Sequence, residues 1–119
     1  MTSKILRLAG VILAVSVTMC AASAALAGDC EGRVVGVKPV SQYNHAAGSG
    51  FLAVRSGPGS KFRQKGELYA GDIVSVYGRS GGWYEVTCME GRCADPLWGP
   101  AYPSGWASSR YIRASGVCP

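Results

Sequence analysis

The sequence predicts an all-β fold, a small barrel of about five to six short strands, on three observations. No segment after residue 27 carries apolar residues at helical spacing for even three turns. Short runs rich in β-branched and aromatic residues recur instead, and glycine, proline, serine or aspartate separates them at close intervals. Closing so small a sheet into a barrel removes exposed edges that would otherwise favour aggregation.

The first 27 residues predict a removable secretory signal peptide, which lies outside the fold. Lys4 and Arg7 precede the apolar stretch 8–17, and small residues lead up to Ala27. This order of positive charge, apolar stretch and small residues is typical of a signal peptide that is cleaved on export. Cleavage after Ala27 would leave residues 28–119, the size of a single domain, in the periplasm or outside the cell.

Two other interpretations of this segment stay open. An uncleaved membrane anchor would use residues 8–27, which are nearly long enough to span a bilayer but contain Ser16, Thr18 and Ser23. A lipoprotein anchor would use Cys20, although the residues directly before it are not small. With cleavage as predicted, the mature chain has no integral membrane span.

The charge balance is mildly basic and argues against nucleic acid as a partner. The whole chain has a net charge of +5, and loss of Lys4 and Arg7 with the signal peptide leaves a net charge of +3. The basic residues are scattered and form no run that would follow a phosphate backbone. We expect only weak attraction to anionic cell-wall polymers or lipid headgroups.

The cysteine count predicts two disulfides. Four cysteines remain after the signal peptide is removed: Cys30, Cys88, Cys93 and Cys118. An even number in an exported chain implies disulfides, and three pairings are possible. The spacing favours Cys88 with Cys93 across a short loop, which leaves Cys30 and Cys118 to tie the two ends of the domain together. A zinc site from Cys30, Cys88, Cys93 and His45 is the alternative.

The expected strands and turns follow in order along the chain. The first strand is expected over residues 33–37, which are rich in valine, and Pro39 ends it. Residues 41–50 are polar, small and glycine-rich without periodicity, which predicts a long loop. A single helical turn is expected near 108–111. Further strands are expected at 51–55, 62–69, 73–77 and 83–88, with turns at 56–59, 70–72 and 79–82.

Residues 52–59 read Leu-Ala-Val-Arg-Ser-Gly-Pro-Gly, and further glycine-containing blocks follow. These are 66–68 (Gly-Glu-Leu), 71–76 (Gly-Asp-Ile-Val-Ser-Val), 81–86 (Gly-Gly-Trp-Tyr-Glu-Val) and 104–112 (Ser-Gly-Trp-Ala-Ser-Ser-Arg-Tyr-Ile). The blocks and their order resemble the bacterial SH3-like (SH3b) domain family, with Ala53 where asparagine is usual. The resemblance covers about 33–112 and implies an SH3-like barrel in an exported protein with a single such domain.

Two segments depart from the family's pattern and are candidates for specificity. One is the long loop 41–50, and the other is the insertion 89–103 before the last block. Cys93 lies inside this insertion and is expected to anchor it by a disulfide. Three prolines in the insertion lower the entropy cost of holding one shape.

The residues expected in the mature chain do not predict an enzyme or a cofactor. Catalysis requires a nucleophile with a base, paired carboxylates, or a metal with an open position. The only histidine is His45, which is expected in a loop, and the sequence shows no partner for it. We therefore expect a protein that binds rather than one that catalyses.

Seven residues are the candidates for ligand contact: Tyr43, Arg55, Tyr69, Trp83, Trp98, Tyr102 and Trp106. Exposed aromatic rings stack on sugars or grip extended peptides. The four on loops or turns, Tyr43, Tyr69, Trp98 and Tyr102, are expected to be exposed. Trp83 and Trp106 have packing on the barrel as an equal alternative. Arg55 is a candidate donor, with a salt bridge to Asp72 or Glu67 as its alternative.

The resemblance implies a module that recognises peptidoglycan or cell-wall peptides, because many exported SH3b domains attach proteins to the wall. The alternative is an envelope protein-protein interaction module, a subunit, regulator or inhibitor, that docks through the insertion 89–103. A structural domain without a ligand is the third interpretation. A monomer is expected in each case.

Overall fold

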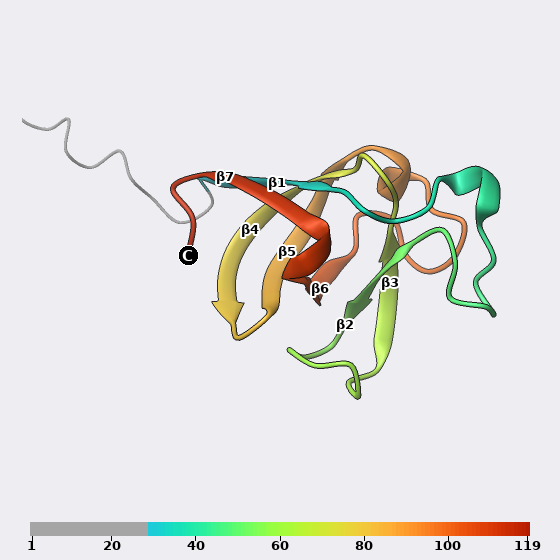
Figure 1. Cartoon of the computed structure of the whole chain (residues 1–119), viewed down its shortest axis with the longest axis horizontal. Helices are drawn as coiled ribbons and strands as arrows, with labels where there is room; N and C mark the ends of the chain where they lie inside the picture. Colours follow the sequence, from blue (N-terminus) through green and yellow to red (C-terminus); the bar gives the residue numbers. More distant parts are fainter. Residues whose placement is uncertain (1–28) are drawn as a thin grey trace, which may run out of the picture.

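The computed structural model describes residues 29–119, and the predicted signal peptide lies outside the described residues. The described chain forms seven strands, and its only helices are single 3-10 turns (Figure 1). The strands are β1 (Cys30–Val34), β2 (Leu52–Arg55), β3 (Gln64–Leu68), β4 (Ile73–Ser80), β5 (Trp83–Glu90), β6 (Ser104–Ser108) and β7 (Ile112–Gly116). The 3-10 turns are η3 (Val40–Gln42), η4 (Arg92–Ala94) and η5 (Ser109–Tyr111). The all-β prediction is confirmed, with seven strands in place of five or six.

All strand pairs are antiparallel and belong to one sheet, in the order β3-β2-β6-β5-β4-β1-β7. The sheet curves around a single core, with the β2–β3 hairpin at one end and the β1–β7 pair at the other (Figure 1). No helix within residues 29–119 has the length and hydrophobicity needed to cross a membrane. The result is the small SH3-like barrel that the sequence predicts.

The first strand lies three residues earlier than expected, at Cys30–Val34 rather than at 33–37, and it ends well before Pro39. It lies between β4 and β7, where Gly32 is opposite Val74 on one side and Ala114 on the other. A Cβ atom at Gly32 would lie 2.5 Å from the Ile112 side chain, so only glycine permits this close approach. The run of valines marked the strand, but its pairing with two neighbours fixes its start.

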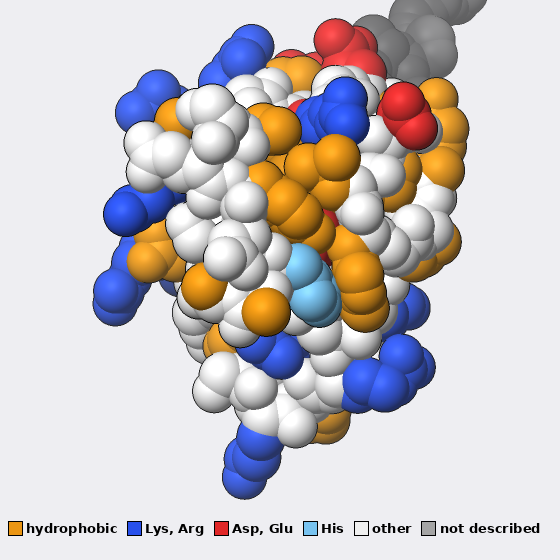
Figure 2. Space-filling view, turned by 90° about the vertical axis from the view of Figure 1, so that its right-hand side faces the viewer, with side chains coloured by type: hydrophobic (Ala, Val, Ile, Leu, Met, Phe, Trp, Pro, Cys, Tyr) orange, Lys and Arg blue, Asp and Glu red, His pale blue; other side chains and the backbone are white. Residues whose placement is uncertain are grey.

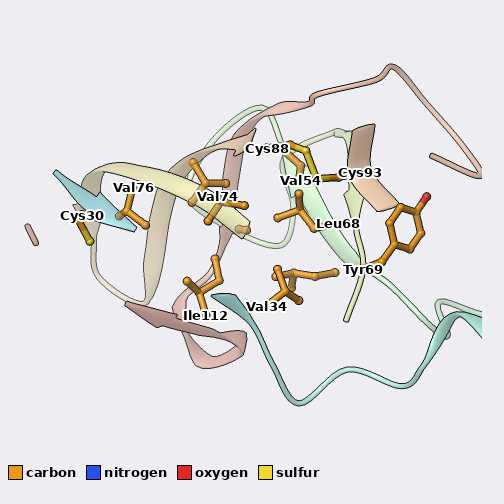
Figure 3. Packing of buried hydrophobic residues seen from close by; sticks show 13 residues of the cluster. Cys30, Val34, Val54, Leu68, Tyr69, Val74, Val76, Cys88, Cys93 and Ile112 are labelled. Atoms are coloured by element: carbon orange, nitrogen blue, oxygen red, sulfur yellow. A yellow bond between two sulfur atoms is a disulfide. The ribbon is translucent and has the colours of Figure 1, made fainter. Parts of the chain in front are cut away.

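The core is formed by the side chains that face inward from successive strands of the sheet. In β1 the burial pattern alternates strictly, as expected for a strand with one face on the core. The fully buried side chains include Val34, Val54, Leu68, Val74, Val76 and Val86 (Figure 3). Branched and compact side chains of this kind suit the interior of so small a barrel.

Two disulfides join to this core, with the pairing that the sequence spacing favours. Cys30 is bonded to Cys118 across a sequence separation of 88, which ties β1 to the segment after β7. Cys88 is bonded to Cys93 across a separation of 5, which ties β5 to η4 in the insertion. In Figure 3, Cys88 and Cys93 lie beside Val54, whereas Cys30 lies at the opposite end of the cluster.

Candidate functional site

The outer face of the β2–β3 hairpin is the foundation of the candidate site. Leu52 is paired with Leu68, and both side chains are buried in the core. Paired residues of neighbouring strands share a face, so the next pair, Ala53 and Glu67, points to the opposite side of the hairpin. Glu67 is nevertheless fully buried. A second layer of chain must therefore cover this outer face.

Loop 41–50 covers this face, and its side chains donate hydrogen bonds to the buried carboxylate of Glu67. The Tyr43 hydroxyl lies 2.9 and 3.1 Å from the two carboxylate oxygens of Glu67, and His45 Nδ1 lies 2.6 Å from Oε2. The Tyr69 hydroxyl donates to Oε1 from 2.6 Å. A buried charge is costly unless it is paired and hydrogen-bonded, and here three side chains satisfy it. Glu67 thereby holds the loop on the hairpin.

Both tyrosines stay protonated and remain donors over the physiological pH range. Burial is the main cause that raises the pKa of Tyr43 to about 12, and its hydrogen bond to Glu67 adds to the effect. Burial followed by the hydrogen bond to Glu67 also raises the pKa of Tyr69 above its usual value. The negative charge of Glu67 would repel a tyrosinate at either position.

The ring of His45 connects loop 41–50 with the insertion 89–103. It stacks on Trp98 with ring centroids 4.4 Å apart and an interplanar angle of 20°. It also lies nearly parallel to Phe51, at 5.6 Å and 18°. Tyr43 approaches Phe51 at 5.8 Å in a tilted arrangement. Offset or tilted contacts of this kind contribute beyond the area they bury. The two segments that depart from the family's pattern thus meet at one histidine.

A second buried carboxylate, Asp72, fixes the start of the insertion. Its side chain accepts hydrogen bonds from the backbone N–H groups of Arg92 at 2.7 Å, Cys93 at 3.1 Å and Tyr69 at 2.7 Å. Burial raises the pKa of Asp72, and the three N–H donors act in the opposite direction. The Tyr69 hydroxyl also accepts a bond from the Leu97 N–H at 2.9 Å. The insertion is therefore held in one shape by the disulfide and by buried polar groups.

Glu67 and the residues packed over it, Tyr43, His45 and Trp98, form what we call the Glu67 corner. Beside this corner an open groove of about 700 Å³ runs over the outer face of β2. Its floor includes Phe51, Ala53 and Arg55, which alternate along the strand, and Gln64 of β3 opposite Arg55. Its walls are loop 45–50 and, on the other side, residues 36–38 with Tyr111. Figure 2 shows this face, where hydrophobic side chains gather around the histidine, one Lys or Arg side chain lies directly beside it and others lie at the periphery.

The candidate ligand residues occupy three different places. Arg55 lines the groove, while Tyr43 and Trp98 form its supporting corner. Tyr102 is exposed in the insertion and does not line the groove. Trp83 of β5 and Trp106 of β6 are half-buried, and neither lines the groove. Trp106 is paired with Arg55 of β2, next to the groove.

Three expectations were wrong. Tyr43, expected to be exposed, is half-buried and packs against the core. Tyr69, expected to be exposed, is fully buried because it lies under the cover layer and bonds to Glu67 and Leu97. The salt bridge considered for Arg55 does not form with either carboxylate, because both have other partners. Arg55 Nη1 instead donates to the backbone carbonyl of Phe62 at 3.0 Å, which ties down the β2–β3 turn.

Sequence reasoning missed the partner of His45. His45 and Glu67 are 22 residues apart, and no local pattern joins them. Lys38, Phe51 and Tyr111, which line the groove, were also missed. The one available signal was the alternation in 62–69, which places Glu67 and Tyr69 on one face and Leu68 on the other.

The pair of His45 and Glu67 shares one feature with catalytic sites. A histidine bonded to a buried carboxylate resembles half of a general-base system. Within residues 29–119, however, no serine, threonine or thiol forms a hydrogen bond with His45, and the four cysteines are in disulfides. The same described residues contain no cluster of three metal-ligating side chains. The histidine serves here as a structural link between two loops.

Comparison with known protein families gives one match. Residues 50–113 match the family described as the bacterial SH3 domain, which is more than half of the chain. The match begins at the floor of the groove and contains the insertion, while loop 41–49 and β1 lie before it. A search of curated proteins found none that matches this sequence.

Proposed function

The chain belongs to the bacterial SH3 domain family, and on this premise we propose that it is an exported module that binds peptidoglycan or cell-wall peptides in the groove over β2. Domains of this family are generally non-catalytic binding modules and are often related to the cell wall. The observation that carries the proposal is the open groove of about 700 Å³ beside the Glu67 corner. A fold alone does not define a ligand, so the support for wall binding comes from the groove and its lining.

The size and lining of the groove suit a short peptide. Ligand sites in proteins typically have volumes of about 300 to 1,000 Å³. Small residues, including Ala47, Gly48 and Ala53, leave the floor and one wall open, and the rings of Phe51 and Tyr111 offer apolar surface. The hydrogen bonds to Glu67 fix one side of the groove before a ligand arrives, which lowers the entropy cost of binding.

Export agrees with the covalent structure of the domain. The two disulfides are typical of proteins outside the reducing cytoplasm, as is the family. On this basis residues 1–27 act as a signal peptide, and residues 28–119 work in the periplasm or outside the cell. Sequencing the N-terminus of the exported protein tests the cleavage after Ala27.

The test of wall binding is co-sedimentation of the exported, oxidised protein with purified peptidoglycan at low and moderate salt. Ala53→Trp fills the floor of the groove, and Ala70→Trp places the same ring on an exposed turn outside the groove. We expect salt-resistant sedimentation of the natural protein and of Ala70→Trp, and loss of sedimentation in Ala53→Trp. No sedimentation of the natural protein, or equal sedimentation of both variants, would reject the proposal.

One observation favours the alternative, an envelope protein that docks through the insertion 89–103. Of the seven exposed large hydrophobic side chains in residues 29–119, four lie in this insertion: Met89, Leu97, Trp98 and Tyr102. A rigid loop with exposed aromatic rings is suited to a protein interface. If this alternative holds, an envelope protein co-purifies with the natural chain and with Ala53→Trp. The same envelope protein does not co-purify with the Leu97→Ala, Tyr102→Ala double variant.

A further inference from the structure

The charges of the chain are distributed unequally around the groove. Between Gly32 and Gly66 the sequence contains six basic residues and no acidic one. The next two acidic residues, Glu67 and Asp72, are fully buried and bonded to other groups. Residues 32–72 therefore present cations to solvent without any exposed carboxylate of their own. The six basic residues are Arg33, Lys38, Arg55, Lys61, Arg63 and Lys65.

Two of these cations, Lys38 and Arg55, line the groove. The only ion pair among the described residues joins His45 and Glu67. No carboxylate of these residues therefore forms an ion pair with Lys38 or Arg55. Arg55 uses Nη1 for the Phe62 carbonyl, which leaves other guanidinium N–H groups for a ligand. This bond also restrains the side chain before a ligand arrives. Lys38 is exposed and makes no side-chain hydrogen bond within residues 29–119.

We propose that the groove recognises a free carboxylate of its peptide ligand, held by Arg55 and Lys38. This proposal rests on the function proposed above and names the chemical group that the site selects. A guanidinium presents its N–H groups in a planar fork that matches a carboxylate, and such bonds are stronger than neutral ones. The small and aromatic residues of the groove then contact the uncharged part of the peptide. A peptide whose carboxylates are amidated loses this anchor.

The test compares two forms of one probe, namely soluble peptide-bearing fragments released from peptidoglycan by a glycan-cleaving enzyme. One portion stays native, and in the other a carbodiimide with ammonia converts the carboxylates to amides. Binding of each portion to the full chain, after export and oxidation, is measured by titration calorimetry at fixed salt. We expect the native fragments to bind at least about 10-fold more tightly than the amidated ones.

Charge-matched variants locate the effect in the groove. Arg55→Gln and Lys38→Gln should each weaken binding of the native fragments several-fold and leave binding of the amidated fragments unchanged. Arg113→Gln removes the same charge from an exposed position on β7 outside the groove and should change neither. Lys38 is exposed and makes no side-chain hydrogen bond or ion pair within residues 29–119, so Lys38→Gln remains informative if Arg55→Gln is unstable.

The outcomes separate the two levels of the proposal. Equal binding of native and amidated fragments would overturn carboxylate recognition and leave the wall-binding function standing. An equal loss in Arg113→Gln and Lys38→Gln would also overturn it, because net charge rather than a site would then account for the attraction. Failure of both fragments to bind, together with no sedimentation on intact peptidoglycan, would reject the function itself.

Discussion

At the β1–β7 end of the sheet, valine side chains and the Cys30–Cys118 disulfide hold the chain together. At the β2–β3 end, two buried carboxylates organise the structure. Glu67 holds loop 41–50, and Asp72 holds the start of the insertion. Glu67 and Asp72 are the only buried polar or charged side chains among the described residues. Both lie within the short stretch from β3 to the start of β4.

The difference shows how one small barrel separates stability from recognition. Apolar burial is non-directional and stabilises any well-packed arrangement, whereas hydrogen bonds to a carboxylate require particular donors in particular places. Most of loop 41–50 and of the insertion lies outside the strands, so strand pairing does not define the shape of these segments. Directional bonds to buried carboxylates supply that definition, and the groove forms beside them.

The largest effect on stability is expected at the β1–β7 end. Replacing Cys30 and Cys118 with alanine opens a loop of 88 residues, and the chain-entropy model assigns such a loop about 4 to 5 kcal/mol. The matched change at Cys88 and Cys93, with a separation of 5, should cost about 2 kcal/mol. Urea denaturation measures both.

The Cys30→Ala, Cys118→Ala variant also tests whether the two ends act separately. Molecules that remain folded should bind peptidoglycan with unchanged affinity, because the disulfide joins the start of β1 to the segment after β7, whereas residues 36–38 and Tyr111 of the groove lie at the opposite ends of these two strands. Reduced affinity at temperatures where the variant is folded would show that the ends are coupled.

The next largest effect is expected for Glu67→Ala. The change leaves Tyr43, Tyr69 and His45 without their acceptor and opens a cavity, at a cost of about 3 kcal/mol or more. Unlike loss of the terminal disulfide, it should also weaken binding in the groove, because loop 41–50 loses its attachment. Urea denaturation and sedimentation give the two readouts.

Glu85→Ala provides the control, since Glu85 is exposed on β5. Its free energy of unfolding should stay within about 0.5 kcal/mol of the natural protein. A Glu67→Ala protein as stable as this control would contradict the role given to the buried carboxylate.

A smaller effect is expected for Asp72→Asn. The amide keeps the shape of the carboxylate, but its nitrogen cannot accept the N–H bonds that now converge on both oxygens. We expect a loss of about 1 to 3 kcal/mol in the free energy of unfolding. Asp95→Asn, on the exposed side of the insertion, should change stability little. Equal losses in the free energy of unfolding for the two variants would contradict the role of Asp72 in holding the insertion.

Much of the barrel could be predicted from the sequence because local patterns specify it. Alternating valines and glycine-rich turns mark strands such as 73–77, and cysteine spacing favoured the observed disulfides. None of the strands expected from local patterns lay at β6 or β7, and β1 was expected at 33–37 instead of Cys30–Val34. The lengths of β1 and β7 depend on their pairing with each other, which no local pattern encodes.

The site could be predicted only in part, because its residues are brought together by register. Tyr69 was expected to be exposed because it is the last residue of the expected strand 62–69 and borders a turn. Its face of the hairpin is covered by a loop that begins 28 residues earlier in the chain, at residue 41. Which face of a strand is buried cannot be read from that strand when an irregular segment folds over it.

The smallest effect is a pH dependence at the β2–β3 end. The pKa of Tyr43 is raised from 10.0 to about 12, so the folded protein favours the protonated phenol more than the unfolded chain does. The stability from this preference is complete below pH 10 and is lost as the pH rises through about 12. An ultraviolet absorbance titration of tyrosinate should show a late step to which both Tyr43 and Tyr69 contribute, and Tyr43→Phe should lower its amplitude. The step should keep its full amplitude in Tyr102→Phe, and a titration identical in both variants would contradict the assignment.

The central claim is that the buried polar corner shapes the groove through His45, and one comparison tests it most directly. Trp98 and Tyr102 are both exposed aromatic residues of the insertion, but only Trp98 stacks on His45, and neither lines the groove. Sedimentation with peptidoglycan should weaken several-fold in Trp98→Ala, recover in Trp98→Phe and stay unchanged in Tyr102→Ala. Equal losses in Trp98→Ala and Tyr102→Ala would contradict the claim and assign binding to the insertion itself.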